Sequence, residues 1–170
     1  MRLFVALTPP PELRARLGEL ADIAHARCGG RRMPDASLHV TLAFLGEVTE
    51  AQAAELVAWV QGLSITPGEW HINRWGSFRR PGIVWLGGDE GAPALQRLQG
   101  RLWGTLEPLG VGVRPARYIP HVTLLRRATV LDLDPFPPIA LTWSYNQLEL
   151  IQSTIDERGA RYRSLAVSQG

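Results

Sequence analysis

The sequence contains no lysine, and all 18 of its basic residues are arginines. The formal net charge is only +2, which argues against a molecule whose whole surface binds polyanions. The bias toward arginine is typical of a GC-rich coding sequence, and arginine also suits bidentate contacts to phosphate. Composition alone does not choose between these two explanations.

Cysteine and long apolar runs are also scarce. Cys28 is the single cysteine, so an internal disulfide is excluded and a reducing compartment is favoured. The longest apolar runs, such as Leu3–Leu7, are far too short to cross a bilayer, and the N-terminal segment lacks the layout of a signal peptide. We therefore expect a cytoplasmic protein that is not inserted in a membrane.

The 170 residues correspond to one domain, residues 1–170, with mixed α and β elements. Helical periodicity and capping signals predict three helices, over Glu12–Arg27, from the capping box at Thr49 to Gln61, and from Pro93 to just before Gly110. Strands are expected at the following segments: Arg2–Thr8, Leu38–Leu45, Ile65–Trp75, Gly82–Gly87, the segment after Pro120, Leu141–Trp143, Gln147–Thr154 and Tyr162–Val167.

One tetrapeptide occurs twice, as His39-Val40-Thr41-Leu42 and as His121-Val122-Thr123-Leu124. Two of the four histidines are therefore followed by the same three residues. In a strand, successive side chains point to opposite faces, which puts the histidine and threonine on one face and the valine and leucine on the other. A pseudo-twofold duplication with one tetrad per lobe would make the two imidazoles face each other across a cleft.

This pair of tetrads suits acid–base chemistry on a small anion. Two imidazoles with ordinary pKa values near 6.5 can hold opposite protonation states, so that one accepts a proton while the other donates one. The hydroxyls of Thr41 and Thr123 can donate hydrogen bonds to the anion. Few carboxylates lie near the tetrads and no third or fourth ligand is evident, so we expect no metal and no cofactor. The chemistry that fits is metal-free attack of water on a phosphodiester.

The doubled His-x-Thr-hydrophobic motif resembles the two-histidine (2H) phosphoesterase superfamily, and within it the RNA 2′,3′-cyclic phosphodiesterases, historically called 2′-5′ RNA ligases. The resemblance covers nearly the whole chain. It rests on four stretches: Met1–Leu7, Leu38–Gly46, Val84–Gly87 and Pro120–Arg126.

The resemblance implies a bilobal α+β fold, in which antiparallel sheets line a central cleft and helices lie outside. It implies hydrolysis of the 2′,3′-cyclic phosphate at an RNA end to a 2′-phosphomonoester. We expect the protein to be a monomer. His39 would be the proton donor and His121 the acceptor, an order that the symmetry of the sequence does not itself reveal. Thr41 and Thr123 would bind the phosphate.

Arg126 matches the arginine that follows the second motif in the family, and Phe44 stands at the same offset after His39, where it could stack on a base. Strict alternation puts both on the face opposite the histidines, so they reach the cleft only if the strands bulge after the tetrads. We therefore expect the Phe44 side chain to pack in the core and the Arg126 side chain to contact the phosphate. Tyr118 is a further candidate for stacking, although the family often has its aromatic residue immediately before the Pro-His-Val-Thr segment.

Other functions remain open on the sequence alone. The same site could cleave 2′-5′-linked oligonucleotides or small cyclic nucleotides, or run in reverse as a ligase, although water should favour hydrolysis. A non-enzymatic module that only binds phosphorylated RNA ends is the alternative from another class.

Overall fold

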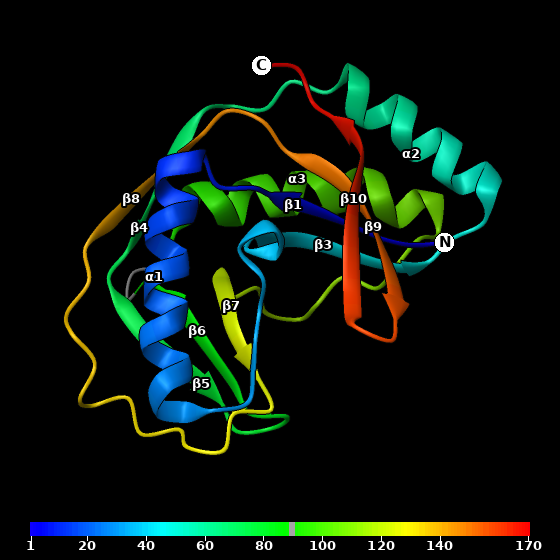
Figure 1. Ribbon diagram of the computed structural model, residues 1–170. Helices are drawn as coiled ribbons and strands as arrows, with labels where there is room; N and C mark the ends of the chain where they lie inside the picture. The colour runs from blue at the N-terminus through cyan, green and yellow to red at the C-terminus, as the bar shows by residue number, and fades with distance from the viewer. Residues whose placement is uncertain (89–90) are drawn as a thin grey trace.

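The computed structural model describes residues 1–88 and 91–170 as a mixed α+β fold with three α-helices and a short 3-10 turn (Figure 1). The helical segments are α1 (Pro11–Cys28), η1 (Asp35–Ser37), α2 (Glu50–Gly62) and α3 (Pro93–Leu109). The strands are β1 (Arg2–Leu7), β2 (Arg31–Arg32), β3 (Val40–Glu47), β4 (Gly68–Ile72), β5 (Arg74–Phe78), β6 (Ile83–Gly87), β7 (His121–Arg126), β8 (Leu141–Tyr145), β9 (Glu149–Asp156) and β10 (Gly159–Val167).

Local signals set the ends of the helices. Proline occupies the first turn of α1 and of α3, where its missing N–H is not needed. Thr49 and Gln52 form the predicted capping box at the start of α2, with N···O distances of 2.9 and 3.1 Å. Gly110 ends α3 in a left-handed conformation, with φ of 71°. The three predicted helices are confirmed.

One antiparallel sheet of eight strands carries both tetrads, in the order β10-β9-β1-β3-β7-β6-β5, with β2 beside β7. The halves β10-β9-β1-β3 and β7-β6-β5 meet at β3 and β7, where Val40 pairs with Val122. The expected two lobes are thus halves of one sheet, joined at the middle of the two tetrads.

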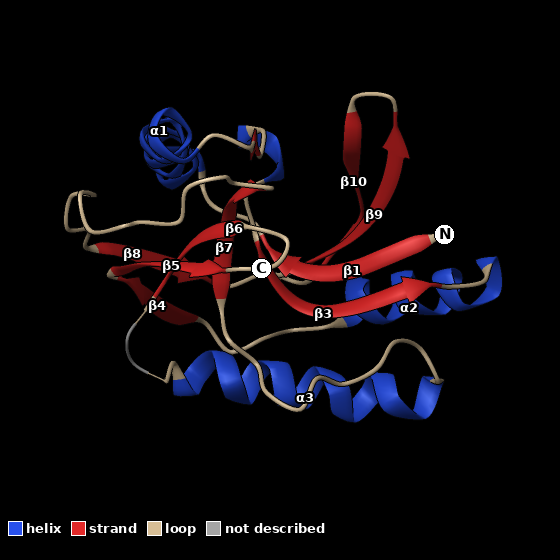
Figure 2. Cartoon of the chain, turned by 90° about the horizontal axis from the view of Figure 1, so that it is seen from below, coloured by secondary structure: helices blue, strands red, loops and turns tan. Residues whose placement is uncertain are grey.

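The helices cross between the halves. Helix α1 follows β1 but packs on β7 and β2, whereas α3 follows β6 and packs on β3 and β4. Each of these two helices therefore packs on the half of the sheet that does not contain the strand before it, which agrees with the predicted pseudo-twofold arrangement with helices outside. In Figure 2, α3 lies below β3, β4 and β5, and the β9–β10 hairpin rises on the opposite side.

One predicted strand is wrong in extent. The segment Ile65–Trp75 forms two strands, because β4 pairs with β8 in a separate two-stranded sheet while β5 joins β6 in the large sheet. The chain changes sheets at Asn73, whose backbone N–H donates to the carbonyl of Gly87 at 2.9 Å. A continuous β-prone run does not show where its hydrogen-bonding partner changes.

Most of the interior is one large apolar cluster that includes Leu17, Leu20, Leu86, Trp103 and Trp143. A smaller buried cluster contains Phe4, Ala6 and Ile151. In the two described ranges, no helix is both long and apolar enough to cross a membrane.

Candidate active site

Both tetrad histidines are anchored in the same way. Nδ1 of His39 lies 2.7 Å from the carbonyl of Ser37, and Nδ1 of His121 lies 2.7 Å from the carbonyl of Ile119. A carbonyl oxygen only accepts, so each Nδ1 is the donor and the neutral ring keeps its lone pair on Nε2. The fold therefore presents both Nε2 atoms for proton transfer.

The sheet register brings the two tetrads into contact. Because β3 and β7 are antiparallel and pair at Val40 and Val122, that register puts each histidine opposite the threonine of the other tetrad. Both valines are buried, while the histidines and threonines are half-buried on the other face. The predicted arrangement of two polar half-sites on one face agrees with this geometry.

Each strand bulges at the last residue of its tetrad, which changes the direction of the side chains that follow. In β3, Ala43 pairs with Val5 and Thr41 with Ala6, so Leu42 is the extra residue of a bulge. In β7, the register with β6 shifts in the same way at Leu124. Each bulge buries two successive residues, the motif leucine and the one after it, which returns the following side chain to the polar face.

Phe44 and Arg126 therefore lie on the same face as the histidines. Phe44 is 48% exposed, so the expectation that it belongs to the core is wrong, and the reason is the bulge at Leu42. Arg126 is exposed and lines the same cavity as His39 and Thr41. Both strands thus contain the bulge that was required for Phe44 and Arg126 to reach the face of the histidines.

Different aromatic rings surround the two imidazoles. His39 packs against Phe4 and Tyr162, with ring centroids 4.9 and 5.5 Å away. His121 lies beside Phe78 and Trp85, at 5.3 and 6.0 Å. Sequence reasoning missed all four rings, because nothing in their spacing shows which strand they will adjoin.

Gly76 makes room for one of these rings. It pairs with Trp85 across β5 and β6, and a Cβ on Gly76 would lie 2.1 Å from Cζ2 of that indole. A side chain at this position would push Trp85 away from His121. The glycine therefore fixes part of the surface on which the second imidazole rests.

Burial dominates the electrostatics of the pair. Loss of hydration lowers the pKa of His39 to about 4, and the nearby Arg126 charge acts in the same direction. Burial also lowers the pKa of His121, with a further contribution from Arg126. In the free protein at neutral pH, both imidazoles are therefore neutral bases.

The two half-sites differ in their hydroxyls. Oγ1 of Thr41 lies 2.9 Å from Nε2 of His39, and because that nitrogen holds the lone pair, the hydroxyl donates. Within the described ranges, Nε2 of His121 has no hydrogen-bonding partner. His121 is therefore ready to accept a proton, whereas His39 must first release the hydroxyl.

Tyr118 supports the backbone of the first tetrad. Its phenol donates to the carbonyl of Thr41 at 2.9 Å, and its own carbonyl accepts from Nε2 of Gln96 at 2.7 Å. Burial raises the pKa of the phenol, so it stays protonated and keeps donating. The half-buried ring borders the cleft, but its hydroxyl is occupied within the protein.

Two cavities extend from Thr41 and Phe44. The first cavity, which we call the basic arm, measures about 400 Å³ and is lined by His39, by five arginines and by the inner face of the β9–β10 hairpin. The apolar arm, of about 340 Å³, contains His121. The lining of the basic arm includes Arg2, Arg31, Arg126, Arg158, Ser153, Ile155 and Tyr162, and that of the apolar arm includes Phe78, Val113, Pro115, Arg117 and Ile119.

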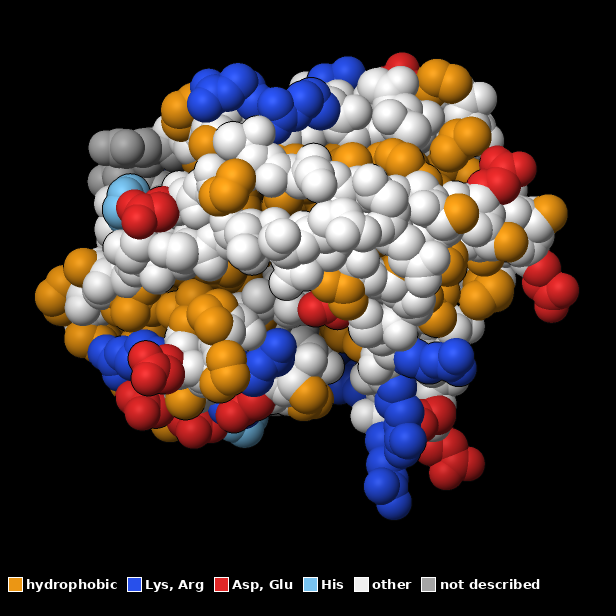
Figure 3. All heavy atoms as spheres, turned by 90° about the horizontal axis from the view of Figure 1, so that it is seen from above, with side chains coloured by type: hydrophobic (Ala, Val, Ile, Leu, Met, Phe, Trp, Pro, Cys, Tyr) orange, Lys and Arg blue, Asp and Glu red, His pale blue; other side chains and the backbone are white. Residues whose placement is uncertain are grey.

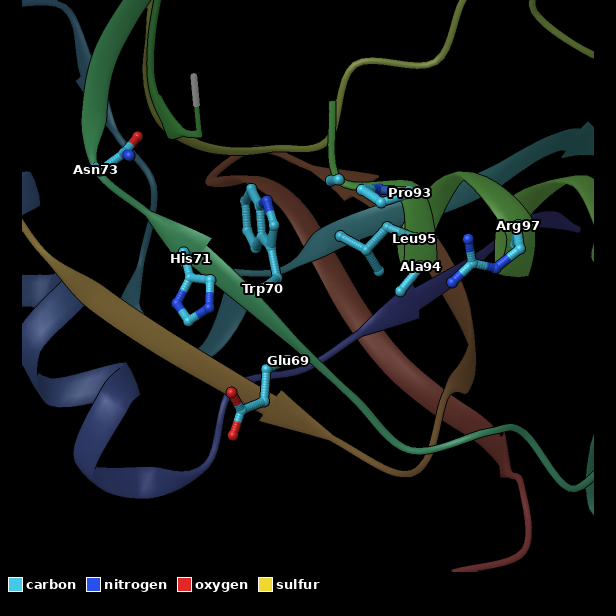
Figure 4. Close-up of a pocket in the computed structure, with 9 residues that line it drawn as sticks. Glu69, Trp70, His71, Asn73, Pro93, Ala94, Leu95 and Arg97 are labelled. Atoms are coloured by element: carbon cyan, nitrogen blue, oxygen red, sulfur yellow. The ribbon is translucent and has the colours of Figure 1, made fainter. Parts of the chain in front are cut away.

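A third cavity lies away from the tetrads. It measures about 370 Å³ and lies between β4 and the start of α3, where Figure 4 shows Trp70, His71 and Arg97 around it. No tetrad residue lines it. His71 instead lies 3.2 Å from the hydroxyl of Thr142 on the neighbouring strand, as suits a residue on the exposed face of a sheet.

Potential metal ligands are sparse throughout the described ranges. No group of three or more histidine, cysteine, aspartate and glutamate side chains lies close enough to hold an ion. The donors at the tetrads are two imidazoles and two hydroxyls, a set suited to an anion.

Comparison with known proteins agrees with this geometry. The family model described as LigT like Phosphoesterase matches residues 7–85, and the RNA 2′,3′-cyclic phosphodiesterase of Escherichia coli is 30% identical over 96% of this chain and 93% of its own. The chain belongs to the LigT-like phosphoesterase family. The enzyme of the same name from Thermus thermophilus is also 30% identical, over 97% of this chain and 88% of its own.

Solved structures extend the likeness to the whole fold. E. coli LigT complexed with 3′-AMP superposes with a TM-score of 0.83 at 28% identity, covering 98% of this chain and 95% of that one. A shorter match, to the RNA 2′,3′-cyclic phosphodiesterase of Aeropyrum pernix, is 33% identical over 65% of each chain. The resemblance to the 2H phosphoesterases, first seen in the repeated tetrapeptide, is confirmed.

Proposed function

We propose that this protein hydrolyses the 2′,3′-cyclic phosphate at the end of an RNA strand to a 2′-phosphomonoester. The observation that supports it most is the matched pair of imidazoles. In each, Nδ1–H is bonded to a backbone carbonyl, so that Nε2 holds the lone pair, and both share a face with the two threonines. The relatives that match most of the chain carry the name of this activity.

The proposed reaction exchanges one P–O bond for another. Neutral His121 takes a proton from water through Nε2 as the water oxygen attacks phosphorus. The bond from phosphorus to O3′ breaks, and protonated His39 gives its proton to O3′. Water thus supplies the new phosphate oxygen and one proton, and the product carries a 2′-phosphate and a free 3′-hydroxyl.

Charge on the phosphate is stabilised by the remaining polar groups of the face. Thr41 and Thr123 donate hydrogen bonds to the non-bridging oxygens, and the guanidinium of Arg126 adds a positive charge. The substrate anion favours the charged form of a nearby imidazole. Its binding therefore raises the pKa of His39, so that His39 becomes protonated and can act as the acid. The hydroxyl of Thr41 then turns from Nε2 toward the phosphate.

One chain supplies both histidines and both threonines, which is the basis for proposing that the monomer is active. Size-exclusion chromatography with light scattering at assay concentrations tests this. The proposal also includes a cytoplasmic location, which rests on the single cysteine.

The deciding experiment incubates the protein with an oligoribonucleotide that ends in a 2′,3′-cyclic phosphate, in the presence of EDTA. We expect complete conversion to the 2′-phosphate, identified by chromatography against 2′- and 3′-phosphate standards. A 3′-phosphate product would contradict the proposed bond cleavage, and loss of turnover in EDTA would contradict metal-free chemistry. Tight binding of the cyclic end without any product would instead identify an RNA-end binding module.

A further inference from the structure

The basic arm extends the site well beyond the atoms that react. Its outer wall is the β9–β10 hairpin, which projects from the body of the molecule with charged side chains around its turn (Figure 3). On the inner face of the hairpin, Ser153, Ile155 and Tyr162 line the cavity. Ile155 is 75% exposed there, although it is a large apolar residue.

Arg31 ties the tip of this hairpin to the rest of the sheet. Its Nη2 donates to the backbone carbonyl of Arg158 at 2.8 Å, across a separation of 127 residues. Gly159 makes this approach possible, because a Cβ at that position, where φ is 110°, would overlap the Arg31 guanidinium. The Arg31 guanidinium is therefore held against the backbone of the hairpin turn at Arg158, and both residues line the cavity.

Within the described ranges, these two guanidiniums keep their positive charge unpaired. Among the described residues, neither Arg31 nor Arg158 forms an ion pair with a carboxylate. Arg32, in contrast, is bonded to Asp22 and Asp35, and Arg161 to Asp156. These two arginines thus contribute positive charge to the lining of the basic arm that no carboxylate of the described residues offsets.

The two arms differ in the ligand they suit. The apolar arm contains one arginine, Arg117, among its lining residues, whereas the basic arm contains Arg2, Arg31, Arg126 and Arg158 besides the ion-paired Arg32. An RNA strand that ends at the tetrads brings its next phosphate one nucleotide away from the cyclic phosphate. Arginine is the side chain best suited to bind that phosphate, in a bidentate manner.

We propose that Arg31 and Arg158 bind the phosphodiester immediately 5′ of the terminal, cyclised nucleotide, so that the β9–β10 hairpin guides the RNA strand out of the site along the basic arm. This inference rests on the proposed function. It makes the substrate a polynucleotide end rather than a free cyclic mononucleotide, with the preference carried by a single phosphate.

Three substrates test this: a 2′,3′-cyclic mononucleotide with a 5′-hydroxyl, the same mononucleotide with a 5′-phosphate, and an oligoribonucleotide with a cyclic end. We expect the second and third to exceed the first in kcat/KM by about tenfold or more, as a charge-assisted contact provides. Arg158→Ala should remove most of this preference. The kcat/KM for the first substrate should stay within about twofold of the parent value, because that substrate has no 5′-phosphate for Arg158 to contact.

Arg163→Ala is the matched control, because it removes the same charge from the same hairpin, where alternation places it on the face opposite Tyr162. Arg158→Ala should keep the tie to Arg31, because the acceptor is a backbone carbonyl. If both variants reduce oligonucleotide turnover equally, or if Arg158→Ala affects all three substrates alike, the proposal is wrong.

Binding provides a readout that does not depend on turnover. The dissociation constant of a fluorescent oligoribonucleotide with a 2′-phosphate end should rise about tenfold in Arg158→Ala and in Arg31→Ala, and hardly change in Arg163→Ala. The slope of log K against log salt should fall by about 0.7 for each lost contact to single-stranded RNA. An unchanged dissociation constant would overturn this inference, whereas absent turnover with these binding shifts would overturn only the proposed reaction.

Discussion

The two halves of the site share a backbone and differ in what surrounds it. Both have a histidine bonded through Nδ1 to the carbonyl two residues earlier, a threonine on the same face and a bulge at the motif leucine. His39, however, is enclosed by Phe4 and Tyr162 and already bonded to a hydroxyl, whereas His121 has a free Nε2 in the described structure. Symmetry thus provides the geometry, and the neighbouring strands break that symmetry, as the proposed division into an acid and a base requires.

Removing either imidazole should have the largest effect. His39→Ala and His121→Ala should each lower kcat by at least about 10²-fold, because each removes one partner of the proton transfer. His71→Ala, at an exposed strand histidine away from the tetrads, is the matched control and should leave the rate unchanged. Steady-state kinetics with a cyclic-ended substrate measure the effect, and circular dichroism verifies folding. Retention of activity in either tetrad variant would contradict the paired scheme.

The pH dependence should show which protonation states the free protein holds. In the proposed mechanism the productive form has one neutral and one protonated imidazole. Burial places both pKa values below 6.5, that of His39 at about 4. Below both values no base remains, and above both no acid remains. We therefore expect a bell-shaped profile of kcat/KM centred on the acid side of 6.5.

On the alkaline side of that profile, kcat/KM should fall about tenfold for each pH unit. The profile of kcat should lie at higher pH, because bound substrate raises the pKa of the acid. NMR titration of the two rings provides an independent assignment of the free-protein values. A flat plateau of kcat/KM through pH 7 to 8 would contradict the lowered pKa values.

Replacing either threonine should weaken phosphate binding to a similar extent, but only one replacement should affect His39, the proposed acid. Thr41→Val and Thr123→Val each remove one donor to the phosphate, for an expected loss of about ten- to 100-fold in kcat/KM. Only Thr41→Val also removes the hydroxyl that bonds Nε2 of His39, so only this variant should shift the pH profile. Identical profiles for the two variants would show that this hydrogen bond does not influence the acid.

Phe44 and Arg126 stand at equivalent positions and should act on different parts of the substrate. If Phe44 stacks on the terminal base, Phe44→Ala should raise KM about tenfold for a cyclic nucleotide, within the range measured for base–aromatic stacking. A ribose 2′,3′-cyclic phosphate without a base should not respond to this change, but it should respond to Arg126→Ala. The reverse pattern would exchange the two roles.

Much of this site was predictable because the signal was local. The repeated tetrapeptide gives the periodicity of a strand and the chemistry of the face, and capping signals place α2 and α3. The bulges at Leu42 and Leu124 could be stated only as a condition, because a bulge depends on the register with β1 and β6. That register decides whether Phe44 is buried or exposed, and the sequence alone favoured the wrong outcome.

The sequence did not predict features that form between distant parts of the chain. The rings beside the histidines come from β1, β5, β6 and β10, and the basic arm joins Arg31 to Arg158 across 127 residues. The change of sheet at Asn73 has the same cause. In each case a side chain's neighbours follow from strand order, which alternation within a single strand does not encode.

Tyr118 should have the smallest effect on the reaction. Its hydroxyl supports the carbonyl of Thr41 in the first half-site, and this hydrogen bond should contribute about 1 kcal/mol to stability. Tyr118→Phe keeps the ring and leaves that carbonyl without its donor, so we expect a small drop in the midpoint of urea unfolding and less than a threefold change in kcat/KM, about half of a kcal/mol. Tyr118→Leu also removes the aromatic face. A large rise in KM for Tyr118→Leu alone would assign base stacking to this ring, whereas equal effects of both variants would leave it a support for the backbone that carries His39.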